Sequence, residues 1–271
     1  AAVAPFRPED KVHVDLLATF LKVGAPELVQ TLGNLERAGL FLRRGRLVRI
    51  LPDVLADHLV LKSALNRMDK PTGIVDLWLE AFRKTFFGNL LENLGNLEYR
   101  LRFRTHAQVD NVLLAEFWKS TFNQIPRMTN IARWELLTEL QKVAIFQPEA
   151  ILQILEIVTH GPRAPRDASA HMWGVKDDPL RALDRAPALL SLVLLHPQHA
   201  AIAATRLCEL IQLLGVKSGT PDTVLDALRK AVQYDHRFLF RTEDALTISA
   251  ATLDAVATFA RTRMTEPDDL D

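Results

Sequence analysis

Residues 28–59 decide the fold, and they read LVQTLGNLERAGLFLRRGRLVRILPDVLADHL. Leu28, Leu32 and Leu35 recur at helical spacing, which predicts an amphipathic helix. Gly39 follows the last apolar residue of this stripe, at the position where a helix C-cap is expected. The stretch therefore begins with one helix and a well-marked end.

A short basic hairpin, the wing, is predicted directly after this helix. Two apolar segments, residues 40–42 and 47–51, flank the sequence Arg-Arg-Gly-Arg of residues 43–46, a turn signal of hairpin length. Pro52 suits the first position of a following helix, where its missing N–H is not needed. The order helix, hairpin, helix predicts a winged-helix domain over residues 1–66.

Composition limits the classes of protein that remain. The 271 residues contain 33 Lys and Arg and 33 Asp and Glu, so the net charge is zero. A generic binder of nucleic acid or membrane surfaces normally has a basic excess. No apolar run reaches the roughly 20 residues that span a bilayer, and no signal peptide is visible. We expect a cytoplasmic protein without membrane contact, and the first residues, Ala-Ala-Val-Ala-Pro, suggest a piece of a longer chain.

Helical periodicity dominates after the wing. Residues 73–87, for example, carry Ile74, Leu77 and Trp78 on one apolar stripe. The single cysteine, Cys208, lies in a similar apolar pattern and is expected to be a buried structural thiol. A mainly α fold follows, with the winged helix at its N-terminal end.

The helical body, residues 67–271, shows a weak internal repeat. Residues 140–158 and 189–211 each contain an apolar helix, a short break, a proline and a second apolar helix. The two prolines, Pro148 and Pro197, are about 49 residues apart, close to the roughly 40–47 residues of HEAT-like repeats. A HEAT-like α-solenoid and a plain helical bundle both fit this pattern.

Two segments carry a family resemblance. LERAGLFLRRGRLVRILPDVLADHL, residues 35–59, resembles the winged helix that follows the nucleotide-binding core of bacterial STAND-type NTPases, relatives of NACHT and NB-ARC proteins. NLLENLGNLEYR, residues 89–100, is similar to their first helical region. The resemblance covers residues 10–125. It implies a sensor region that couples recognition of a partner to a nucleotide-binding domain outside this chain.

The resemblance also singles out Asp53. Many members of the family carry Met-His-Asp at the start of the helix after the wing, and the histidine approaches the phosphate of the nucleotide. The matching residues here are Leu51, Pro52 and Asp53, and Pro52 cannot donate a hydrogen bond. Asp53 is therefore the residue that the resemblance would place toward the nucleotide domain. An ordinary helix-start carboxylate at the positive end of the helix dipole is the alternative.

No chemistry of its own is expected from the chain. Neither a G-x-x-x-x-G-K-[ST] phosphate loop nor a G-x-G-x-x-G after a predicted strand occurs. His196 and His199 stand three residues apart without a third ligand at suitable spacing, so no metal site is expected. We predict a non-catalytic module without a cofactor, whose partner is a protein or the NTPase domain.

The wing offers a nucleic-acid alternative. Arg43, Arg44 and Arg46 could contact phosphates, as the wing does in DNA-binding winged helices. The preceding helix, however, carries Glu27 and Glu36, whose carboxylates repel a phosphate backbone. A wing that docks on an acidic protein surface, or one that is simply solvated, is therefore favoured, and a winged-helix nucleic-acid-binding protein is the alternative.

A second basic cluster comprises Arg100, Arg102 and Arg104, which alternate with apolar and aromatic residues. In an extended segment the three arginines would share one face and could extend a nucleic-acid footprint. On a helix they would splay. A basic edge whose aliphatic stems cover apolar surface is the commoner arrangement.

The segment of residues 161–179, GPRAPRDASAHMWGVKDDP, lacks a helical pattern. Long loops of this kind in compact domains are usually functional or disordered. It carries Arg163, Arg166 and Trp173, residue types that are enriched in interface hot spots. We expect this loop to present a partner contact, unless Trp173 folds back over the neighbouring helices.

Overall fold

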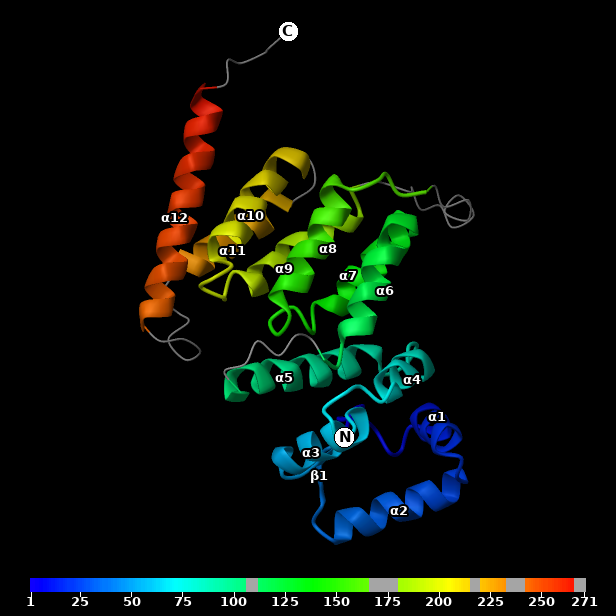
Figure 1. Ribbon diagram of the computed structural model, residues 1–271. Helices are drawn as coiled ribbons and strands as arrows, with labels where there is room; N and C mark the ends of the chain where they lie inside the picture. The colour runs from blue at the N-terminus through cyan, green and yellow to red at the C-terminus, as the bar shows by residue number, and fades with distance from the viewer. Residues whose placement is uncertain (106–111, 166–179, 215–219, 233–241, 266–271) are drawn as a thin grey trace. The chain divides into compact units, whose positions relative to one another are not determined.

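The computed structural model describes residues 1–105, 112–165, 180–214, 220–232 and 242–265 (Figure 1). The predicted fold class is confirmed, because the chain is mainly helical and has a small antiparallel hairpin near its N-terminus. The chain divides into two compact units, Ala1–Lys119 and Ser120–Asp271. The domain boundary at residue 66 stays a prediction.

The N-terminal unit has the element order predicted for a winged helix. Its elements are α1 (Lys11–Leu21), α2 (Ala25–Arg37), β1 (Phe41–Arg44), β2 (Leu47–Ile50), α3 (Asp53–Ala64), α4 (Ile74–Ala81), α5 (Phe87–Thr105) and the start of α6 (Ala115–Gln124).

Helix α2 ends as the sequence predicts. Gly39 has a φ of +74°, in the left-handed region that glycine adopts without steric cost. The N–H of Gly39 donates to the Glu36 carbonyl, and the N–H of Leu40 donates to the Leu35 carbonyl, both at 3.0 Å. This pair of bonds is the Schellman motif, which satisfies the last carbonyls of a helix and turns the chain out of its axis.

The wing is tighter than the sequence suggests. Strands β1 and β2 pair antiparallel with Arg44 opposite Leu47, so only Gly45 and Arg46 form the loop. Gly45 has a φ of +59°, which suits a two-residue hairpin loop. The assignment of residues 43–46 to the turn was therefore too long, because the first two arginines lie in β1.

The N-terminal segment adds one more pairing to the wing. Phe6 and Val48 form an antiparallel bridge, with N–H to carbonyl distances of 3.2 and 2.9 Å. Val48 is only 2% exposed. The helix after the wing begins at Asp53, one residue later than predicted, and Pro52 is its N-cap.

Helix α5 supplies the core of the N-terminal unit. Its leucines Leu90, Leu91 and Leu94 are completely buried. The helix continues to Thr105, so the extended segment considered for residues 99–104 is wrong. The leucine spacing of α5 continues through this segment and determines its conformation.

Polar side chains of α5 bind backbone groups beside this core. Asn89 donates to the Pro5 carbonyl at 2.9 Å, and Asn93 donates to the Ala4 carbonyl at 2.6 Å. The buried Glu98 accepts from two backbone N–H groups just before α6, at 2.5 and 3.0 Å. Buried polar groups need such partners, and these bonds fix both the N-terminal segment and the start of α6.

The second unit is built from consecutive helices. They are η1 (Ile125–Arg127), α7 (Asn130–Leu140), α8 (Pro148–His160), η3 (Ala182–Arg185), α9 (Ala186–Val193), α10 (Ala200–Leu214), α11 (Thr220–Val232) and α12 (Thr242–Thr265). Contacts join α8 to α9, α9 to α10, α10 to α11 and α10 to α12 (Figure 1). The choice between a HEAT-like array and a bundle stays open.

Equivalent turns of the two predicted repeats contact each other. The His196 side chain is 5% exposed, and its Nε2 donates to the Ile145 carbonyl at 2.7 Å. His199 lies 3.1 Å from a Glu149 carboxylate oxygen. These residues join the α7–α8 connection to the α9–α10 connection, so the two histidines have a structural role.

Gly33 within α2 and Gly39 just after it give a matched stability test. Gly39→Ala should lower the free energy of unfolding by about 1–2 kcal/mol, because an L-residue is strained at positive φ. Gly33 is helical, and a Cβ added there meets nothing within 4 Å. Gly33→Ala should therefore raise the free energy of unfolding by about 0.5–1 kcal/mol. Urea denaturation measures both, and equal effects would contradict the αL cap.

His196 predicts a pH dependence. Burial lowers the pKa of its imidazole below the ordinary value of 6.5, so the unfolded state binds the proton more readily. Stability should therefore be lost as the pH falls below about 6.5. His196→Gln keeps a donor for the Ile145 carbonyl and should have a flatter stability profile between pH 7 and pH 5.5. His160→Gln, at an exposed site, should keep the wild-type slope; a wild-type slope in His196→Gln would refute the assignment.

Candidate functional site

Arg43 is exposed, but its guanidinium is paired with carboxylates of the N-terminal unit. Its guanidinium binds both Glu36 carboxylate oxygens, at 2.7 and 2.9 Å, and also pairs with Glu9. The hydrogen bond to Glu36 is the main cause that raises the pKa of Arg43, and it lowers the pKa of the Glu36 carboxyl. Arg43 therefore joins β1, the end of α2 and the N-terminal segment, and its charge is matched within the chain.

Arg44 and Arg46 are the wing arginines whose charges remain available to a ligand. Both are exposed, and neither forms an ion pair with any residue that the structure describes. Arg49 lies 4.0 Å from Asp53, the first residue of α3. Asp53 is exposed and fits an ordinary helix-start carboxylate. Its predicted role toward a nucleotide domain stays a prediction.

Helix α2 is poorly equipped to read DNA bases. Glu27 stands in its first turn, where a carboxylate would face the phosphates on approach. The late arginine, Arg37, donates to the Asn34 side chain at 2.5 Å and to the Gly33 carbonyl at 3.4 Å. The guanidinium that a recognition helix would direct at a base is thus engaged with its own helix.

The second basic cluster does not form a shared face. Both terminal nitrogens of Arg100 contact the Asp57 carboxylate, at 2.8 and 2.6 Å, which ties α5 to α3. Arg102 is half-buried. The side chain of Arg104 lies outside the described part of the structure. Successive arginines two residues apart on a helix point about 200° apart, so the arginines splay, as expected for a helix, and the extended-segment alternative with its common face is wrong.

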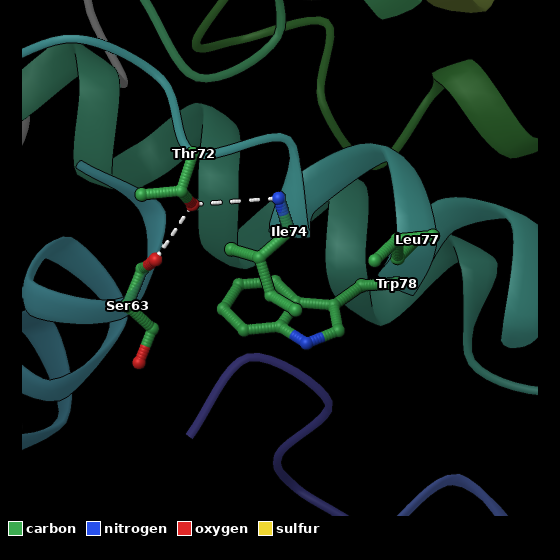
Figure 2. A pocket seen from close by; sticks show the side chains of 5 residues that line it. All are labelled: Ser63, Thr72, Ile74, Leu77 and Trp78. Atoms are coloured by element: carbon green, nitrogen blue, oxygen red, sulfur yellow. Dashed lines mark hydrogen bonds between the residues drawn. The ribbon is translucent and has the colours of Figure 1, made fainter. Parts of the chain in front are cut away.

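The structure adds an apolar depression that the sequence did not reveal. It measures about 500 Å³, is open to solvent, and is lined by Ser63, Thr72, Ile74, Leu77 and Trp78. Figure 2 shows it between the end of α3 and the start of α4. No titratable group is among these five lining residues.

The hydroxyl of Thr72 helps to shape this depression. It donates to the Ser63 carbonyl at 2.8 Å and accepts from the Ile74 N–H at 3.4 Å (Figure 2). Leu77 is 54% exposed, whereas Val75 and Leu79 of the same helix are buried. The stripe through Leu77 predicted the opposite, and this mismatch is the signal that marks the depression. It can accept an apolar side chain.

The partner loop lies mostly outside the described residues. Arg163 is exposed, but Arg166 and Trp173 belong to the segment of residues 166–179, which the structure does not describe. The partner loop therefore stays a prediction. Cys208 is buried, and burial raises the pKa of its thiol, as expected of a structural cysteine.

No family model, curated protein or solved structure matches the chain. The resemblance to STAND-type NTPases stays a prediction. Within the described ranges, no group of three His, Cys, Asp or Glu residues is placed to hold a metal ion. In the same ranges, no helix has the length and apolarity needed to cross a bilayer.

The wing arginines should differ in what they contribute to stability. Arg43→Met removes the charge that Glu9 and Glu36 hold and should lower the melting temperature of the N-terminal unit. Arg44→Met removes an unpaired charge and should leave it unchanged. The difference should shrink in 1 M NaCl, where charges are screened beyond about 3 Å. Equal melting temperatures for the two variants in low salt would show that Arg43 is not paired in solution.

Proposed function

We propose that the chain is a non-catalytic interaction and sensor region of a bacterial STAND-like signalling or defence NTPase. Its winged helix would bind protein, either the NTPase domain or a partner, in the cytoplasm. Arg43 is the observation that supports a protein partner most strongly. A wing that uses an arginine to hold Glu9 and Glu36 keeps two carboxylates at the surface where DNA phosphates would approach.

Charge favours the same conclusion. The N-terminal unit contains 17 Lys and Arg against 14 Asp and Glu, a small excess. Arg44 and Arg46 are the wing arginines left open. Two phosphate contacts give a log–log salt slope of roughly −2, whereas proteins that contact 6–10 phosphates have slopes of about −5 to −9. Such a wing is too weakly charged for DNA to be its main ligand.

The apolar depression supplies a second feature that suits a protein partner. Interface cores are depleted in charge and enriched in aromatic residues, and the half-buried Trp78 lies beside the exposed Leu77. A partner that fits the N-terminal unit would offer carboxylates to Arg44 and Arg46 and an apolar side chain to the depression.

Fluorescence anisotropy with a labelled 20-base-pair duplex tests this preference. Between 50 and 200 mM salt, we expect weak binding without sequence preference and a log–log slope of about −2. The double variant Arg44→Ala/Arg46→Ala should lose most of this weak DNA binding, whereas Arg229→Ala, in the other unit, should keep it. Sequence-selective binding with a slope of −6 or steeper would favour the nucleic-acid alternative.

The NTPase part of the proposal has its own test. The parent gene, read upstream of the codon for Ala1, should encode a G-x-x-x-x-G-K-[ST] phosphate loop. Its absence would contradict the STAND assignment and leave the protein-binding assignment intact. The chain alone should not hydrolyse ATP; turnover that a substitution in this chain abolishes would contradict the proposal.

A further inference from the structure

Two arginines of the second unit converge on one tryptophan. The guanidinium carbon of Arg185 lies 4.6 Å from the centroid of the Trp134 ring, and that of Arg181 lies 5.3 Å from it. Trp134 belongs to α7, and Arg181 and Arg185 stand at the two ends of η3, which packs on α7. These three residues form the arginine–tryptophan cluster.

The charges of this cluster are not matched within the described part of the chain. Neither Arg181 nor Arg185 forms an ion pair there, and the Nε of Arg185 is buried without a hydrogen-bond acceptor in those residues. Arg206, in the same unit, shows the contrast, because it pairs with Glu156 and Glu209. The tryptophan ring attracts each guanidinium, but the two like charges still repel each other.

We propose that the arginine–tryptophan cluster binds the carboxylates of an acidic segment in a partner protein. Each guanidinium can bind a carboxylate through two parallel N–H groups; in Arg185 these belong to the two terminal nitrogens, because its Nε is buried. Contact with Trp134 restricts both side chains before binding, so less conformational freedom is lost when a carboxylate arrives. Tryptophan and arginine are also the residue types most enriched in interface hot spots.

A protein ligand fits this site better than a nucleic acid. The second unit contains 19 Asp and Glu against 16 Lys and Arg, so a phosphate backbone is repelled beyond the immediate contact. Guanidinium groups already cover the Trp134 ring, which leaves less of its face for a base to stack on. A short acidic segment needs only the two local charges. The inference shares with the proposed function the premise of a protein partner, but it concerns a different unit from the wing.

Anisotropy of a fluorescein-labelled peptide of eight glutamates tests the site in the whole chain. We expect saturable binding, and none to a matched peptide of eight glutamines. Arg181→Ala and Arg185→Ala should each weaken binding by about tenfold. The affinity of Arg181→Lys, which keeps the charge but loses the planar fork, should lie between that of the alanine variants and that of the wild type. Arg229→Ala, an exposed arginine of the same unit, is the matched control.

Several outcomes would overturn the proposal. One is equal weakening by Arg181→Ala and Arg229→Ala; another is a duplex DNA that displaces the peptide from Arg181 and Arg185. A third is binding that is seen only after Asp177 and Asp178, which precede Arg181 in the sequence, have been replaced by asparagine. That result would mean that the wild-type chain already supplies carboxylates to these arginines. If an alanine variant fails to fold, the test instead follows the NMR signals of the Nε–H groups of Arg181 and Arg185 in the wild-type chain. They should shift with the glutamate peptide, and unshifted signals would also overturn the proposal.

Discussion

The burial of helix α5 is the constraint on which the N-terminal unit depends. Its leucine face lies fully inside the unit, so neighbouring polar groups must find partners. Asn89 and Asn93 meet this need by holding the carbonyls of the N-terminal segment. That segment carries Phe6, which pairs with the wing, and Glu9, which holds Arg43. A helix more than 80 residues from the N-terminal segment thereby helps to determine how the wing presents its charges.

The arginines of this chain are distinguished by what already holds them. Arg43 and Arg100 each bind a carboxylate through two nitrogens and join separate elements of the N-terminal unit. Arg181 and Arg185 instead rest on an aromatic ring. An arginine that is bonded within the fold must give up those bonds to bind a ligand, whereas one held by a ring keeps its terminal N–H groups for a ligand. Counting arginines by position in the sequence hides this difference.

Local signals in the sequence predicted local structure well. Gly39 and Gly45 lie at positive φ, and glycine tolerates such backbone angles, so the helix end and the hairpin loop could be recognised. The alternation of residues 99–104 misled, because six residues are too few to separate a strand pattern from a helical one. Pairs such as Arg43–Glu9 and Arg100–Asp57 span 34 and 43 residues, and no spacing rule reveals them. The sites therefore needed the structure, whereas most of the elements could be recognised from the sequence.

We propose that the wing uses Arg43 to stabilise its own fold and binds protein through its remaining arginines. The Nε–H signal of Arg43 in an NMR spectrum tests it most directly. We predict a resolved signal whose proton exchanges slowly with water. The Glu36→Gln substitution should broaden this signal, and added duplex DNA should not shift it. A signal averaged with those of the exposed arginines, or one that shifts on DNA addition, would contradict the account.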